Sequence, residues 1–248
     1  MDVGARGQVP SGIMRLGFGA LLALVLLLGV SVAPAFALEA GQTVRGAVQL
    51  GGMTVPLPAG EWTAYYAVED EDAKFHTSKL GLVLIGGKTV RQMAYFRVSR
   101  SKTGAGFKPY EQCAQPHYFY SETVQNQIGG AQDCWHVHAE TLAPDEASDR
   151  QKALLALAKD RGLFLSLVSI GVRFHRANAD ALLQASYGWP PDLIVKAPKD
   201  VKFWRFQDWT AEAVAKEPRK TVVMSRFKRW GEEWRPQIDP AFSSFIKK

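Results

Sequence analysis

The stretch Lys79–Arg100, KLGLVLIGGKTVRQMAYFRVSR, decides the fold. Two apolar arms flank Gly86-Gly87, and a glycine pair in this position is typical of a tight turn between antiparallel strands. The second arm alternates between two sets of side chains, as a strand with two different faces does: Gln92, Ala94, Phe96 and Val98 against Arg91, Met93, Tyr95 and Arg97. The stretch therefore predicts a long β-hairpin, on which an antiparallel sheet can grow.

The residues before this hairpin read as further strands. TVRGAVQL and MTVPL flank a second glycine pair, Gly51-Gly52. In EWTAYYAV (61–68), strict alternation would place Trp62, Ala64, Tyr66 and Val68 on one face and Glu61, Thr63, Tyr65 and Ala67 on the other. The acidic run 69–74 reads as a loop.

Later segments mix strands and helices. Strands are expected at 133–142 and 163–174. A helix is expected over 144–162, where Pro and acidic residues stand at the start and Gly162 at the end. Short helices are expected at 178–188 and 209–217, the second capped by Asp208, and a last helix runs from Pro218 to a stop at Pro236. The expected class is α+β: an antiparallel β-sheet covered by helices, with a helical C-terminal tail.

The N-terminus has the layout of a secretory signal peptide. Arg6 and Arg15 precede the uncharged core ALLALVLLLGVSVA, and Ala35 and Ala37 form a small-x-small cleavage site. Met14 is an alternative start, and an uncleaved inner-membrane anchor is the alternative to cleavage. We therefore expect a cleaved segment at 1–37, a sheet domain at 38–202 and a helical segment at 203–248 that packs on it. The expected location is the periplasm or the outside of the cell.

The charge is uneven along the chain. Residues 196–248 contain 13 Lys or Arg and 7 Asp or Glu, within a chain of net charge +6. A basic C-terminal quarter favours an anionic partner, such as phospholipid head groups or an acidic protein. The alternative is a solvated helix surface, and export argues against nucleic acid as the partner.

Cys113 and Cys134 are the only two cysteines. In an oxidising compartment, two cysteines at this spacing most simply pair, so we expect a disulfide. A free thiol or a metal thiolate is the alternative.

The strand that contains Cys134 also carries two histidines. On a strand, Cys134, His136, His138 and Glu140 share one face, and Trp135 and Val137 give the other face its core character. The two histidines lie about 6.8 Å apart along the strand, close enough for both to reach one ion. A Cys113–Cys134 bond would hold His117 near them, and such a three-histidine cluster suits zinc or copper. The alternative is that these histidines belong to an ordinary exposed or packed strand and that the protein has no cofactor.

The last helix carries an apolar seam. Val223, Phe227, Trp230 and Trp234 follow helical spacing, with Arg226, Lys228 and Arg229 beside them. The seam is expected to pack on the sheet. Its alternative is a partner-binding or membrane surface formed by Arg226, Phe227, Arg229, Trp230 and Trp234.

Three functions remain open from the sequence. The first is a non-enzymatic, exported binding module of the cell envelope, whose partner is a protein or a small ligand. The second is a periplasmic zinc- or copper-binding protein, or a metal-dependent hydrolase, that uses His117, His136 and His138. The third is a membrane-surface or assembly factor that acts through its basic, Trp-rich C-terminal helices. The motifs of phosphate-binding loops, serine hydrolases and zinc proteases are absent from the sequence.

Overall fold

A computed structural model describes residues 38–115, 118–142, 147–197 and 203–246. The predicted signal segment 1–37 therefore lies outside the described residues. In the part that is described, no helix has the length and apolar character needed to cross a membrane.

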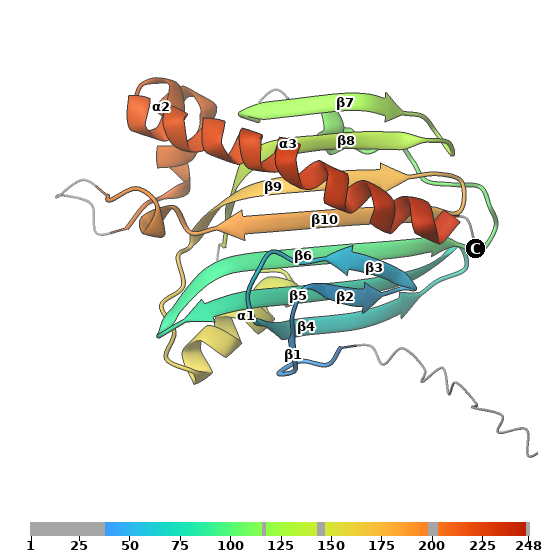
Figure 1. Ribbon diagram of the computed structural model, residues 1–248, viewed down its shortest axis with the longest axis horizontal. Coiled ribbons are helices and arrows are strands. Elements are labelled where there is room, and N and C mark those ends of the chain that lie inside the picture. Colours follow the sequence, from blue (N-terminus) through green and yellow to red (C-terminus); the bar gives the residue numbers. More distant parts are fainter. Residues whose placement is uncertain (1–37, 116–117, 143–146, 198–202, 247–248) are drawn as a thin grey trace, which may run out of the picture. The chain divides into compact units, whose positions relative to one another are not determined.

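One eight-stranded antiparallel sheet organises the chain (Figure 1). The strand order is β1-β4-β5-β6-β10-β9-β8-β7, so two meanders meet where β6 pairs with β10. The strands are β1 (Thr43–Val44), β4 (Trp62–Glu71), β5 (Phe75–Gly86), β6 (Thr89–Ser101), β7 (Tyr120–Asn126), β8 (Gln132–Thr141), β9 (Val168–Ala177) and β10 (Ala181–Trp189). The predicted hairpin is confirmed as β5–β6, and the glycine pair at 51–52 joins the separate hairpin of β2 (Ala47–Leu50) and β3 (Met53–Pro56).

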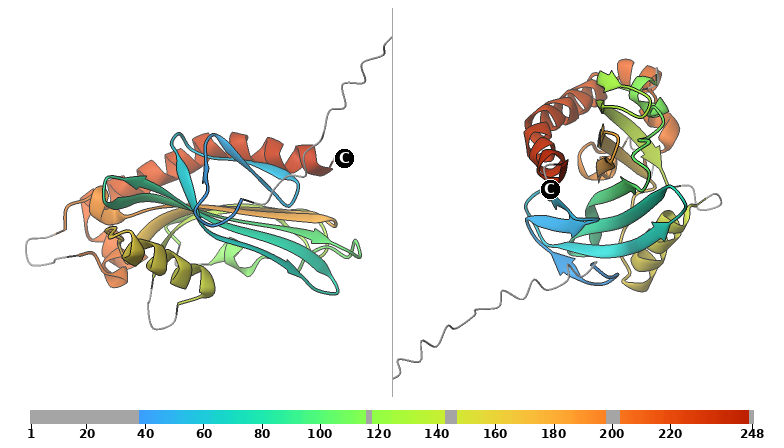
Figure 2. Two further views of the ribbon diagram at one scale, coloured as in Figure 1. Left: turned by 90° about the horizontal axis from the view of Figure 1, so that it is seen from below. Right: turned by 90° about the vertical axis from the view of Figure 1, so that its right-hand side faces the viewer.

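The helices lie on both faces of the sheet. Helix α3 (Pro218–Ile246) and the β2–β3 hairpin lie on one face, here called the front, and α1 (Asp149–Asp160) lies on the back (Figure 2). Short helical turns fill the connections: η1 (Glu111–Ala114), η3 (Pro191–Leu193), η4 (Phe206–Trp209) and α2 (Ala211–Ala215). The protein is thus mostly antiparallel sheet with a few helices, which agrees with the α+β class in its coarse form.

The front face carries the larger apolar core. Phe96, Trp135, Phe174 and Tyr187 from four strands are buried there together with Phe227 of α3. The Tyr187 hydroxyl also donates to the Pro56 carbonyl at 2.8 Å, which ties the β2–β3 hairpin to the sheet. A smaller core on the back face joins α1 to β4–β6 through Leu154, Val83, Val90 and Met93.

Two expectations about strands are wrong. Residues 178–188 form no helix: 181–189 are the central strand β10, because Leu183, Ala185 and Tyr187 alternate into the front core between β6 and β9. In β4, a bulge between Ala64 and Tyr66 breaks the strict alternation. Trp62 and Ala64 therefore pack in the front core, whereas Tyr65 and Tyr66 both pack against the back core. In the acidic run 69–74, residues 69–71 belong to β4, and only 72–74 form the loop that the sequence predicts.

The ends of the helices differ from the sequence pattern in two places. Asp208 accepts from the Arg205 backbone N–H at 2.8 Å and so caps η4, while Thr210 caps α2. Helix α3 does not stop at Pro236 but continues through Pro236 and Pro240 to Ile246. An interior proline costs about 3 kcal/mol, and burial of Ile238 and Phe242 contributes roughly 1.5–3 kcal/mol each. The apolar seam therefore carries the helix past both prolines, which lie on its exposed side.

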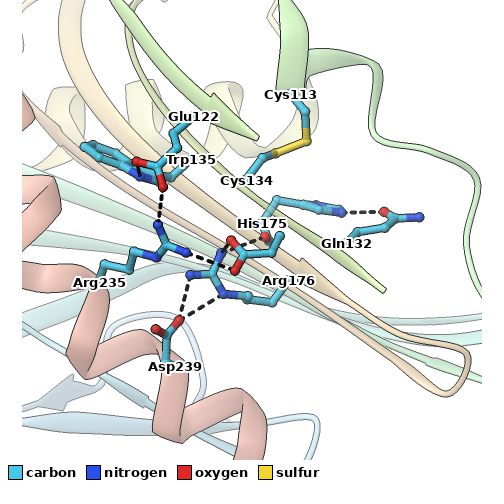
Figure 3. A network of polar contacts seen from close by, with 10 residues as sticks. Cys113, Glu122, Gln132, Cys134, Trp135, His175, Arg176, Arg235 and Asp239 are labelled. Atoms are coloured by element: carbon cyan, nitrogen blue, oxygen red, sulfur yellow. Dashed lines mark hydrogen bonds and ion pairs between the residues drawn. A yellow bond between two sulfur atoms is a disulfide. The ribbon is translucent and has the colours of Figure 1, made fainter. Parts of the chain in front are cut away.

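An ionic network fastens α3 to the edge of the sheet (Figure 3). Arg235 of α3 donates to Glu122 of β7 at 2.7 Å and to Asp133 of β8 at 3.0 Å. Arg176 of β9, only 6% exposed, ion-pairs with Asp133 and bonds Asp239 of α3 at 2.6 Å. A buried guanidinium between two carboxylates would be costly to leave unpaired, so the network fixes the position of the helix along the sheet.

Helix α3 approaches the sheet closely at Gly231. A Cβ atom on this residue would overlap the six-membered ring of Trp135, which is itself 1% exposed. A rigid, buried indole has no room to move, so only glycine fits here.

We predict that Gly231→Ala destabilises the protein by about 1–3 kcal/mol, because it overpacks this contact. The sign of the change shows whether the position is packed or exposed. At an exposed helix position alanine is about 1 kcal/mol more favourable than glycine, so the same substitution would stabilise the protein. Urea unfolding followed by circular dichroism measures the change. Ser225→Ala on the exposed side of α3 is the control and should shift the free energy by less than about 0.5 kcal/mol. A stabilised Gly231→Ala variant would show that the helix does not lie on Trp135.

Candidate functional site

Strand β8 has the two faces that the sequence predicts. Trp135 and Val137 are in the front core, and Cys134, His136, His138 and Glu140 point to the back. The back face is not open to solvent here: His136 is 0% and His138 6% exposed. It is a second packed surface, made of polar and aromatic side chains.

Cys113 and Cys134 lie at disulfide distance, as predicted, with their Cα atoms 5.6 Å apart. The bond joins η1 to β8. Thr123 of β7 donates to the Cys113 carbonyl at 2.8 Å, so the turn is fixed to two neighbouring strands. The disulfide thereby holds η1 beside the histidine side of β8, where Tyr118 stacks on His136.

We predict that reduction of this disulfide lowers the free energy of unfolding by about 3 kcal/mol. The reason is that the unfolded chain is then no longer restricted by a crosslink between residues 21 positions apart. Guanidinium unfolding with and without dithiothreitol measures the loss. A Cys113→Ala/Cys134→Ala variant is the control and should not respond to the reductant. Two alkylatable thiols in the untreated protein would contradict the pairing.

The proposed metal cluster is only partly in view. His136 and His138 are neighbours, with ring centroids 4.9 Å apart, and Tyr118 stacks on His136 at 4.1 Å. His117 lies outside the described residues. Within the described residues, no group of three or more His, Cys, Asp or Glu is arranged to hold a metal ion. The zinc or copper site therefore stays a prediction.

Glu140 is the anionic centre of the back face. Its carboxylate bonds Arg150 of α1 at 2.9 Å and lies 3.7 Å from Arg173 and 3.9 Å from His138. Burial alone would raise the pKa of Glu140, but hydrogen bonding with His138 and the charges of Arg173 and Arg150 outweigh it. They hold the pKa far below its usual range, so Glu140 is ionised throughout the physiological range and serves as a fixed charge.

Arg173 is bonded on several sides. Its Nε donates to Ser186 at 2.7 Å, and its Nη1 donates to Gln112 at 2.7 Å and to the Tyr110 hydroxyl at 3.3 Å. The residues come from β9, β10 and the η1 region, so one guanidinium connects the sheet with the segment that the disulfide holds. With these bonds made, Arg173 is positioned for structure rather than for a ligand.

A small cavity of about 30 Å³ lies beside this cluster, between Tyr95, His138, Ser169 and Ser186. Gly171 and Gly188 keep it open on neighbouring strands, and a Cβ at Gly171 would lie 2.9 Å from His138. A polar space of this size holds about one or two water molecules and is too small for a substrate.

His175 is kept neutral by its partners. The amide NH₂ of Gln132 points at the carbonyls of Phe107, Lys108 and Gln127, at 3.0–3.2 Å, so its oxygen faces His175 Nε2 at 2.7 Å. Gln184 donates to Nδ1 at 3.3 Å. This pair of partners fits the neutral Nε2–H tautomer. Burial, with Arg176, Arg97 and Arg173 nearby, lowers the pKa of His175 to about 3.

The shift gives a pH dependence of stability. Since the folded pKa lies below the ordinary 6.5, the unfolded chain binds the proton first. The contribution of neutral His175 to the free energy of unfolding is complete above about pH 6.5. It declines as the pH falls toward 3, by about 1.4 kcal/mol per pH unit. We predict that His175→Gln flattens the unfolding free energy between pH 6.5 and 5, where carboxylates titrate little. His76→Gln at an exposed site is the control, and equal slopes in wild type and His175→Gln would refute the assignment.

An apolar groove of about 1240 Å³ lies at the end of the sheet where β9 begins. Its walls come from four parts of the chain: Thr141 at the end of β8, the second half of α1, residues 163–168 and residues 203–207. Apolar lining predominates, from Leu155, Ala158, Leu163, Phe164, Leu165, Leu167, Val168, Phe203, Trp204 and Phe206; Thr141, Ser166, Arg205 and Gln207 are the polar members. We call this set the apolar groove.

Asp192 of η3 holds the walls of the apolar groove together. Its carboxylate accepts from the Ser166 hydroxyl at 2.5 Å and from the Trp204 backbone N–H at 3.2 Å. The Trp204 indole donates to the Val195 carbonyl at 2.8 Å, and Phe203 stacks on Phe164. Hydrogen bonds through Asp192 therefore join two of the walls, residues 163–168 and residues 203–207.

The sequence did not reveal this groove. Residues 163–174 read as one continuous strand, but β9 begins only at Val168 and residues 163–167 line the groove instead. In the run LFLSL (163–167), both alternating sets of side chains are mainly apolar. A strand that is buried on both faces and a groove wall have this pattern in common. The sequence did contain one sign of the groove, because the apolar run begins at Leu163, five residues before β9 begins.

The C-terminal seam lies against the sheet. Val223 and Phe227 are buried, and Trp230 and Trp234 are partly buried against Tyr187. Arg226 and Arg229 are exposed on the outer side of α3. Of the residues proposed for a partner or membrane surface, the three aromatic ones are thus engaged within the protein, and the two arginines face solvent.

Comparison with models of known protein families, with curated proteins and with solved structures gives no match for this chain. The geometry of the chain is the basis for any functional assignment.

Proposed function

We propose that the protein is an exported, envelope-associated binding module and that its ligand is a small apolar or amphipathic molecule held in the apolar groove. The observation that carries the proposal is the groove itself: a large, apolar concavity with a few polar side chains at its rim, which is the usual form of a small-molecule site.

Two other observations support this proposal. The exposed polar lining, Thr141, Arg205 and Gln207, supplies hydroxyl, guanidinium and amide groups that can orient a ligand. The N-terminal layout and the paired cysteines both suit an oxidising compartment outside the cytoplasm.

The buried polar layer on the back face supports a scaffold role for that region. Its charges and rings bond one another, and its cavity has room for water only. The apolar groove, by contrast, has exposed aromatic and aliphatic side chains that no other part of the described chain covers, with Leu167 and Phe203 each 47% exposed.

The test is binding of the fluorescent apolar probe 1-N-phenylnaphthylamine. We predict saturable binding that weakens about 10-fold or more in Leu167→Gln/Phe203→Gln, since each loss of buried apolar surface removes roughly 1 kcal/mol or more. The matched control is Val124→Gln/Ile128→Gln, which removes two exposed apolar side chains in and beside the distant strand β7. Unchanged affinity in the groove variant, or an equal loss in the control, would refute the groove as the site.

A further inference from the structure

Exposed apolar side chains gather around the mouth of the apolar groove. Of eight large apolar residues that are exposed in the described part, five are Leu167, Leu193, Ile194, Phe203 and Phe206. Asp192 and Trp204 tie the segments that carry them. Apolar side chains that are exposed singly are common on protein surfaces, whereas such a group of them is typical of a binding site.

Basic residues stand in and next to the segments that form the groove walls. Arg205 lines the groove, with its side chain 71% exposed. Lys88 accepts the Phe164 N–H on its backbone carbonyl, and Lys196 follows Val195, the acceptor of the Trp204 indole. Lys159 and Arg161 stand at the end of α1, where the chain turns into the groove wall. These five basic residues form what we call the basic rim.

The acidic residues nearby offset this charge only in part. Asp192 is occupied by Ser166 and Trp204, and Asp208 accepts from the Arg205 backbone and pairs with its guanidinium at 3.4 Å. Asp160 is exposed at the end of α1. Among the described residues, the wall segments and their neighbours thus carry five basic residues against three acidic ones, while the lining of the groove is mainly apolar.

From this pairing of an apolar floor with a positive rim, we infer that the apolar groove takes an anionic amphiphile, a molecule with one acyl chain and an acidic head group. The chain lies along Phe164, Leu165 and Phe203, and the head group lies at Arg205 on the rim. A wholly apolar ligand would leave the basic rim without a role, and a small hydrophilic anion would leave the floor of the groove unused. The inference rests on the proposed function, since it names the ligand class of the same groove.

The test compares two ligands with the same acyl chain, sodium laurate and uncharged glycerol monolaurate. Both are used as monomers, below the concentration at which they aggregate, to displace 1-N-phenylnaphthylamine from the full mature chain. We expect laurate to bind about 3- to 5-fold more tightly in low salt, the size of one exposed ion pair, and the preference to fade at high salt.

Two variants locate the preference. Arg205→Gln should remove most of it while binding of monolaurate stays unchanged. Arg226→Gln, which removes an exposed arginine of α3 outside the groove, should keep the preference.

The outcomes separate the inference from the proposed function. Equal affinity for laurate and monolaurate, with probe binding still sensitive to Leu167→Gln/Phe203→Gln, would overturn the anionic preference and leave the groove as an apolar site. Displacement by neither ligand, together with insensitivity to the groove variant, would overturn both. Co-sedimentation with anionic phospholipid vesicles without any binding of monomeric laurate would also overturn the inference, because the partner would then be a membrane surface.

Discussion

The contact between Gly231 of α3 and the indole of Trp135 sets the geometry of the front face. It brings the helix axis so close to β8 that the side chains on either side of Gly231, Phe227 and Trp234, reach the strands beyond. The same indole donates to Glu122 at 3.2 Å, and Glu122 binds Arg235 one helical turn beyond Gly231. Apolar packing and ion pairing thus meet at the same part of the interface between α3 and β8. Apolar contact fixes the distance of the helix from the sheet, and the charged network fixes its position along the strands.

The two faces of β8, β9 and β10 have opposite chemistry because the strands pair in register. Trp135 stands opposite Phe174 on the front, and His136 stands opposite Arg173 on the back. The row continues from Arg173 to Ser186 and then to Tyr95 across β10 and β6. A shift of one residue would exchange polar and apolar sides, so the polar row and the apolar core enforce the same register. The polar layer is thereby a structural element in its own right, with a charged centre at Glu140.

Alternation and turn residues made the strongest parts of the fold predictable. The β5–β6 hairpin, the two faces of β8, helix α1 and the cysteine pairing all follow from local pattern or spacing. Three features depend on contacts distant in sequence and were missed. The segment 181–189 has helix-forming residues but is a central strand between β6 and β9. The bulge in β4 lets Tyr65 and Tyr66 pack on one side. Helix α3 passes two prolines because Ile238 and Phe242 are buried against the rest of the chain.

The apolar groove illustrates the same limit for function. Its wall residues come from four parts of the chain that no periodicity connects, and Asp192 joins two of them through Ser166 and Trp204. The groove lies where the front and back cores meet at the end of the sheet: Val168 belongs to the front core, while Leu163 and Leu165 pack against the back core. A sheet with apolar residues on both faces exposes both layers at its end unless a connection closes over them. Within the described residues, 163–168 and 203–207 leave this end open as a groove, and a ligand with an apolar chain would complete the packing there.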